Sequence, residues 1–181
     1  MSRSTRLVTL EDLPVLAELL RENRAFNAPW EPIRDDDYFT VDGQSKVIRS
    51  ALHQHGHGST LPHVILDGAG RVVGRITLNE IVRGPLQSCS LGYWVGAGDN
   101  GRGLATAAVH DIIRVAFEEL GLHRIQAGTL LHNVRSQRVL ERTGFVGYGV
   151  APAYLKIAGE WQDHALYQVV TTGSAASPAD A

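Results

Sequence analysis

The alternation of apolar and polar positions along the chain predicts an ordered series of strands and helices. Apolar or alternating runs typical of strands lie at 6–10, 62–66, 71–82, 88–95, 124–129, 145–150 and 165–170, with a further extended segment at 154–157. Apolar residues spaced three and four apart predict helices that begin after Thr9 and at 44–55, 103–120 and 133–143. Asp12 stands three residues after Thr9, which is the spacing of a capping box. Gly121 and Gly144 end the last two helices.

This order of elements predicts an α/β domain. Most strands follow one another directly, while one strand–loop–helix–strand crossover joins two of them, so we expect a mixed sheet flanked by helices. A chain of 181 residues suits one domain with a sizeable core. We place that domain at 1–170 and expect a disordered tail at 171–181, which is rich in Gly, Ser, Ala and Pro.

Composition and charge narrow the function classes. The hydrophobic fraction of 44% is ordinary for a soluble protein, and the net charge of −2 argues against general nucleic-acid or membrane binding. Cys89 is the single cysteine, so no internal disulfide forms, and we expect it to be a small buried residue. The start of the chain has no apolar signal core, and no apolar run approaches the length of a membrane span. These features predict a cytoplasmic protein, and they leave open whether it is a monomer or a homodimer.

The segment LGYWVGAGDNGRGLA, residues 91–105, carries the strongest chemical signal. An apolar strand leads into a glycine-rich turn, and an amphipathic helix begins directly after it. Gly101 and Gly103 leave the backbone uncovered. The first N–H groups of a helix have no intrahelical partner, and the helix dipole favours negative charge there. The arrangement predicts a site for a phosphate or pyrophosphate.

Two common phosphate sites fit this segment poorly. Gly101-Arg102-Gly103 contains the G-x-G of a dinucleotide site, but Thr106 stands where a third Gly or Ala is expected. The next strand also lacks the acidic residue that such sites place at its end. A P-loop is excluded because the chain has no Gly-Lys-Ser/Thr.

The turn instead resembles the acetyl-CoA loop of the GNAT acetyltransferases, whose pattern is Arg/Gln-x-x-Gly-x-Gly/Ala; Asn100 departs from the usual Arg/Gln. Within that superfamily the chain is similar to the ribosomal-protein alanine N-acetyltransferases, the Rim-type enzymes. The shared segments extend from about residue 6 to residue 170. They are Pro29-Trp30-Glu31-Pro32, Val82-Arg83-Gly84, Leu91-Gly92-Tyr93-Trp94, His123-Arg124-Ile125, His132-Asn133 through Ser136, Thr143-Gly144-Phe145, Gly159-Glu160-Trp161 and Asp163-His164.

The resemblance implies the GNAT fold, with a central, mostly antiparallel mixed sheet, and acetyl-CoA as co-substrate without a metal. It assigns the CoA pyrophosphate to the backbone of the turn, and pantetheine and the acetyl carbonyl to the backbone of Val95 and Gly96. It places Asn133 and Ser136 beside the CoA thiol, where Ser136 protonates the departing thiolate. The turn residues are Asn100, Gly101, Arg102, Gly103, Leu104, Ala105 and Thr106.

Two assignments keep an alternative. Asn133 precedes a short helix, so it can equally be the N-cap. The general base is open, because Ala153 stands where some relatives carry a glutamate after the last Gly-Phe motif. Glu80, or a water held by Glu31, is the candidate substitute.

Loop residues predict the acceptor cleft. Trp30, Glu31, Tyr154 and Trp161, with the acidic run Asp35–Asp37, combine aromatic walls with carboxylates, which suits a cationic amine. An α-amino group, with a pKa of about 7.7–8.0, is far more often neutral than a lysine amine of pKa about 10.4. This difference favours an N-terminal α-amine, or another weakly basic amine, over lysine. The resemblance implies direct transfer in a ternary complex, with the N-terminal alanine of a ribosomal protein as the acceptor. The alternatives are a small-molecule amine or antibiotic acetyltransferase and a non-catalytic acyl-CoA-binding domain.

One cluster predicts no site. His53, His55 and His57 alternate along the chain, and steps of two do not converge on one helix face. No Cys or acidic ligand adjoins them, so we expect no metal there.

Overall fold

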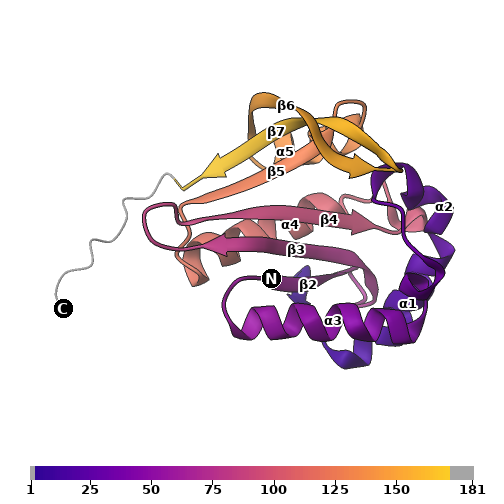
Figure 1. The fold of residues 1–181 in the computed structure, drawn as a ribbon. Helices are drawn as coiled ribbons and strands as arrows, with labels where there is room; N and C mark the ends of the chain where they lie inside the picture. The colour runs from indigo at the N-terminus through magenta and orange to yellow at the C-terminus, as the bar shows by residue number, and fades with distance from the viewer. Residues whose placement is uncertain (1–2, 172–181) are drawn as a thin grey trace.

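A computed structural model describes residues 3–171 and shows one seven-stranded sheet in the order β1-β2-β3-β4-β5-β7-β6 (Figure 1). Neighbouring strands are antiparallel except for β4 and β5, which are parallel. The predicted mixed, mostly antiparallel sheet with flanking helices is therefore confirmed. The strands are β1 Thr5–Leu7, β2 Leu61–Leu66, β3 Val72–Val82, β4 Ser88–Val95, β5 Arg124–Leu130, β6 Val146–Ile157 and β7 Glu160–Val170.

Helices cover both faces of the sheet. On one face α1 and α3 pack on β2 through a cluster that includes Leu16, Ile48 and Val64. On the other face α4 packs its apolar side, including Val109 and Ile112, on the central strands, and α5 lies beside it (Figure 1). The helices are α1 Leu13–Glu22, α2 Arg24–Asn27, α3 Val41–Gly56, α4 Leu104–Arg114 and α5 Val134–Arg142, with a π-helical turn η5 Val115–Glu119 and 3₁₀ turns η1 Leu10–Asp12, η2 Ala28–Trp30, η3 Asp36–Phe39 and η4 Ala97–Asp99.

The sheet opens between its two parallel strands. Strands β4 and β5 pair only at Ser88–Arg124, Cys89–Ile125 and Ser90–Gln126. Beyond Ser90 they diverge, although each continues for several residues (Figure 1). The edge of β4 from Leu91 to Val95 is therefore not paired with β5, and the opening lies next to the glycine-rich turn.

Most predicted elements are present, with shifted ends. The first strand stops at Leu7, and the residues from Leu10 form a 3₁₀ turn because the Thr9 N–H donates to the Asp12 carboxylate at 2.8 Å. The second long helix begins at Val41 rather than at residue 44, since the Thr40 hydroxyl accepts from the Gly43 N–H at 3.0 Å.

Two other regions differ more. The segments predicted at 145–150 and 154–157 form one strand, β6, whose register against β7 shifts between Ala151 and Leu155 and so interrupts the alternation. Strand β7 begins at Glu160, five residues earlier than predicted. Of the predicted tail at 171–181, residues 172–181 lie outside the described part of the chain. Within residues 3–171, no helix is long and apolar enough to span a membrane.

Candidate active site

The glycine-rich turn presents free backbone amides. Gly101 and Gly103 both have left-handed backbones, with φ of 79° and 77°, which glycine adopts without strain. Gly103 is the N-cap of α4, and the first intrahelical bond runs from the Ala107 N–H to the Gly103 carbonyl at 2.9 Å. The N–H groups of the three residues before Ala107 therefore lack an intrahelical acceptor, as expected for an anion site. They belong to Leu104, Ala105 and Thr106.

Two asparagines hold this turn against the end of β4. The Asn100 amide donates to the carbonyls of Gly96 at 3.0 Å and Val95 at 3.3 Å. The Asn23 side chain accepts from the Ala97 N–H at 2.7 Å. These contacts explain how Asn100 can replace the usual Arg/Gln, because its side chain fixes the backbone that carries the amides. The Arg102 guanidinium pairs with the Asp99 carboxylate.

The unpaired edge of β4 adds further donors. The Gly96 N–H donates to the Val73 carbonyl at 2.9 Å, so it points toward β3. Because N–H groups alternate in direction along a strand, those of Tyr93 and Val95 point to the opposite side, where β5 has diverged. This edge can therefore pair with an extended molecule that enters the opening.

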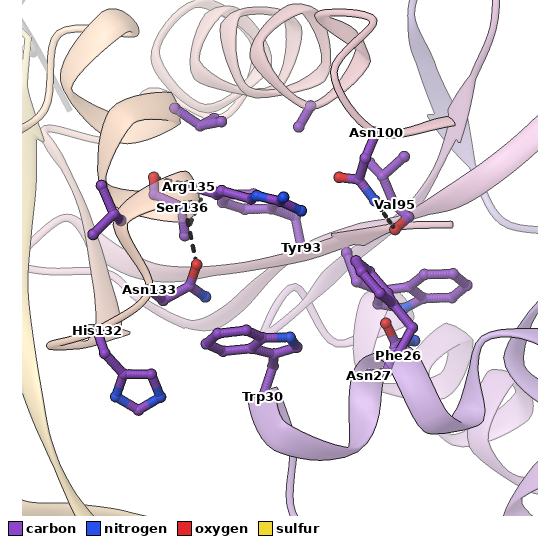
Figure 2. A pocket seen from close by; sticks show the side chains of 14 residues that line it. Phe26, Asn27, Trp30, Tyr93, Val95, Asn100, His132, Asn133, Arg135 and Ser136 are labelled. Atoms are coloured by element: carbon purple, nitrogen blue, oxygen red, sulfur yellow. Dashed lines mark hydrogen bonds between the residues drawn. The ribbon is translucent and has the colours of Figure 1, made fainter. Parts of the chain in front are cut away.

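A cavity of about 390 Å³ lies in this opening (Figure 2). Figure 2 shows Asn133 and Ser136 on one side, Val95 and Asn100 at the far end, and Trp30 facing them. The Trp30 ring lies 5.5 Å from that of His132, between centroids. The cavity thus brings together three groups of predicted residues: the β4 end, the turn and the start of α5.

Asn133 and Ser136 occupy the first turn of α5. The Asn133 side chain accepts from the Ser136 N–H at 3.1 Å, so the N-cap interpretation of Asn133 is confirmed. The Tyr93 hydroxyl lies 2.8 Å from the Ser136 hydroxyl and 3.3 Å from its carbonyl. Burial raises the pKa of Tyr93 to about 12, against the opposing effect of its bond with Ser136. Tyr93 is therefore protonated near neutral pH and can donate to Ser136.

Tyr93 was not predicted as a site residue, although it lies in a shared segment. Its position in the sequence was a usable signal. Tyr93 places a polar hydroxyl between Leu91 and Val95, on the face of β4 that packs in the core. Tyr93 also lines two further cavities. One, of about 160 Å³, extends beneath Ser136 toward Gly128. The other, of about 680 Å³, lies on the face covered by α3.

The predicted acceptor residues are only partly brought together. Glu31 lines the 680 Å³ cavity, where burial raises the pKa of its carboxyl while the nearby Arg34 opposes the shift. The Ala158 N–H, in the β6–β7 turn, donates to the Glu31 carbonyl at 3.0 Å. Tyr154 lies beside the 160 Å³ cavity, with its ring centroid 5.4 Å from that of His164. Trp161 is 65% exposed and lines none of the three cavities.

The other predicted carboxylates have local partners. The Asp35 side chain accepts from the Tyr38 N–H, Asp36 pairs with Arg24 and Asp37 pairs with Lys46. Glu80 is exposed on a left-handed residue of β3, with φ of 52°, and accepts from the Ser90 hydroxyl at 3.1 Å. It lines none of the three cavities. Within residues 3–171, no group of three or more His, Cys, Asp or Glu side chains is placed to hold a metal.

The fold and the site define an acyltransferase of a known class. Residues 5–146 match the model of the acetyltransferase (GNAT) domain. The chain belongs to the GNAT acetyltransferase family and is an N-acetyltransferase.

Two relatives and one solved structure show which members of this family the chain is similar to. The [ribosomal protein uS5]-alanine N-acetyltransferase of Escherichia coli (strain K12) is 35% identical over 167 residues, covering 92% of this chain and 86% of that protein. The probable N-acetyltransferase YjcK of Bacillus subtilis (strain 168) is 39% identical over 153 residues, covering 84% of each chain. The structure of Mycobacterium smegmatis RimJ in complex with CoA-disulfide has a TM-score of 0.88 at 31% identity, covering 92% of this chain and 80% of that one.

Proposed function

We propose that this protein uses acetyl-CoA to acetylate the N-terminal α-amino group of a protein, namely the N-terminal alanine of a ribosomal protein. One observation supports acetyl-CoA as the donor. Two sets of unpaired backbone amides, at the start of α4 and along β4, border the same cavity. The acceptor half is supported by the 35% identity to the uS5-alanine enzyme.

The residues of the site fit acetyl-CoA. The amides of Leu104, Ala105 and Thr106 would hold the pyrophosphate, since a helix N-terminus favours an anion. The N–H groups of Tyr93 and Val95 would hold the extended pantetheine arm and polarise the acetyl carbonyl. When bound, acetyl-CoA supplies the activated acetyl group.

Two side chains would then transfer the protons of the reaction, one as an acid and one as a base. Ser136, held by Tyr93 at 2.8 Å, donates a proton to the leaving sulfur. Glu31 accepts the proton of the attacking amine, directly or through a water, because its desolvated carboxylate is a stronger base than an exposed one. Glu80 is the other sequence-based candidate for this role, but its carboxylate lies outside the cavities.

An activity assay tests the acceptor. The protein is incubated with acetyl-CoA and an alanine-initiated peptide, with the N-terminally blocked peptide as a control, and products are identified by mass spectrometry. Acetylation of the free N-terminus alone supports the proposal. Transfer to a lysine of the blocked peptide, or no transfer to any peptide, contradicts it. Mass spectrometry of ribosomal proteins from a deletion strain then identifies the target.

A small-molecule amine is the second candidate acceptor. The 680 Å³ cavity falls within the range typical of small-ligand sites, about 300–1,000 Å³. Turnover on small amines without turnover on peptides would select this function. Acetyl-CoA binding without acetylation of either acceptor class would instead identify a non-catalytic acyl-CoA-binding domain.

A further inference from the structure

The 680 Å³ cavity contains a cation with no partner. Arg75 lies on β3 opposite Trp94, and its side chain lines the cavity beneath α3. Its Nε atom is buried without a hydrogen-bond partner, and Arg75 forms no ion pair with any residue in 3–171. A buried charge without a partner is costly. Arg75 therefore needs an explanation beyond packing.

The other cations of this cavity have partners. The Lys46 ammonium pairs with Asp37 at 2.9 Å. The Arg34 guanidinium lies 4.5 Å from the centre of the Tyr38 ring. Neither side chain is buried, so solvent screens its charge. Arg75 differs from both because it is only partly exposed, its Nε atom is shielded from water, and no carboxylate of residues 3–171 pairs with it.

The cavity also contains one matching carboxylate. Among the described lining residues Glu31 alone is acidic, and its side chain forms no ion pair with Arg75 or with any other residue in 3–171. The cavity thus contains a carboxylate that forms no ion pair, although Arg34 lies near it, and a guanidinium that forms no ion pair. A molecule complementary to both carries an amine at one end and an anionic oxygen at the other.

A carboxylate is the group that best fits Arg75. The guanidinium presents parallel N–H donors that match the two oxygens of a carboxylate, and charged hydrogen bonds of this kind are among the strongest in proteins. Burial lowers the pKa of Arg75, but an arginine guanidinium is not deprotonated in proteins, so Arg75 stays charged near neutral pH. A neutral peptide carbonyl would satisfy one donor but leave the charge unbalanced.

We propose that Arg75 binds a carboxylate of the acceptor and so selects amines that carry an acidic group nearby. This inference rests on the proposed N-acetyltransferase function and names the acceptor class for the same site. For a protein N-terminus the carboxylate is an Asp or Glu side chain within the first few residues. For a free amino acid it is the α-carboxylate.

Matched peptides test this selectivity. One peptide begins with alanine and carries Glu at the second, third or fourth position, and its partner carries Gln there. For the wild type we expect kcat/KM to be about tenfold to a hundredfold higher for the Glu peptide at the best position. In Arg75→Gln this preference disappears. Free alanine against alaninamide distinguishes the two sources of the carboxylate.

Three measurements separate recognition from folding. Arg49→Gln, which removes an exposed cation of α3 outside the cavity, should retain the Glu preference. Acetyl-CoA affinity, measured by calorimetry, should not change in Arg75→Gln. The Tm of Arg75→Met should stay level or rise by about 2–4 °C, because an unpaired and partly buried charge is removed.

The outcomes distinguish a failure of the Arg75 proposal from a failure of the proposed acetyltransferase function. Equal turnover of the Glu and Gln peptides by the wild type overturns the role of Arg75 and leaves the acetyltransferase function standing. A loss of turnover in Arg75→Gln that is equal on both peptides, with a lower Tm, also overturns it, since Arg75 would then be structural. Failure of every peptide and amino acid contradicts the proposed function itself.

Discussion

The proposed donor and acceptor sides of the site are built from different parts of the chain. The cavity in the sheet opening presents backbone amides from one continuous stretch, β4 and the turn before α4. The cavity beneath α3 presents side chains from separate segments, including Glu31 in a loop, Lys46 on α3 and Arg75 on β3. The first can recognise a group shared by every acyl-CoA, whereas the second can change with single substitutions. A common chemistry can thus serve many acceptors.

Glu31→Gln should have the largest effect and act on the acceptor side only. We expect kcat/KM to fall about a hundredfold, because the variant cannot accept the amine proton, while acetyl-CoA affinity is unchanged. In the wild type, activity should decline as pH falls through the raised pKa of Glu31, above the value of about 4.3 for an ordinary glutamate. Below that pKa the carboxyl is protonated and cannot act as a base.

The pH–rate profiles of Glu31→Gln and of a second variant, Glu80→Gln, check this assignment of the base. In Glu31→Gln the part of the acid limb that belongs to Glu31 should be absent, and only the decline caused by protonation of the acceptor amine, with a pKa of about 7.7–8.0, should remain. An unchanged profile in Glu31→Gln together with a large loss in Glu80→Gln would move the base to Glu80.

Gly103→Val should damage the donor side through the backbone. A β-branched residue at φ of 77° is strained by about 1–3 kcal/mol, and relief of that strain moves the amides that follow. Acetyl-CoA should bind about tenfold to a hundredfold more weakly, as measured by calorimetry. Gly98→Val is the matched control, because Gly98 is exposed, lies outside the left-handed region and leaves open space for a side chain. Equal losses in both variants would refute the role of the turn geometry.

Ser136→Ala and Tyr93→Phe probe the point where the two sides meet. Ser136→Ala should lower kcat about tenfold, a modest loss because a thiol of pKa about 8.5 is already a fair leaving group. Tyr93→Phe should lower kcat less. Combining the two changes should add little, since both act on one hydrogen bond. Tyr148→Phe, on exposed β6, is the control, and additive losses would show that Tyr93 does not act through Ser136.

Arg102→Ala should have the smallest effect. Its guanidinium forms an exposed ion pair with Asp99, and such pairs contribute about 0–1 kcal/mol. Acetyl-CoA affinity should change less than about threefold, because the turn offers amides rather than this side chain. A tenfold loss in calorimetry would place the Arg102 side chain in the donor contact.

The sequence predicted the donor side better than the acceptor side, for a physical reason. The turn conformation follows from local residue types, so Gly101 and Gly103 could be placed before the structure was known. The role of Asn23 could not be predicted, because its hydrogen bond with Ala97 joins the end of α1 to a loop that is distant in sequence. Arg75 was missed since an arginine in a strand is typical of an exposed position, and its burial depends on the packing of α3.

Other acceptor residues show the same dependence on tertiary structure. The run Asp35–Asp37 is predicted to line the acceptor cleft beside aromatic side chains, but each of the three carboxylates is engaged by a neighbouring group. Glu80 follows the alternation of its strand in sequence, yet the irregular register of β3 against β4 between Asn79 and Val82 leaves it on a left-handed backbone. Residue types alone do not reveal such local departures.

Tyr93 borders cavities on the two sides of the opened sheet, and this has a kinetic consequence. In the proposed function acetyl-CoA enters through one cavity and the acceptor through another, so neither substrate must leave before the other arrives. The single thiol of the chain, Cys89, is buried, and that burial raises its pKa to about 12, which makes it unsuited to carry the acetyl group between two half-reactions. Double-reciprocal plots for the two substrates should accordingly intersect instead of running parallel.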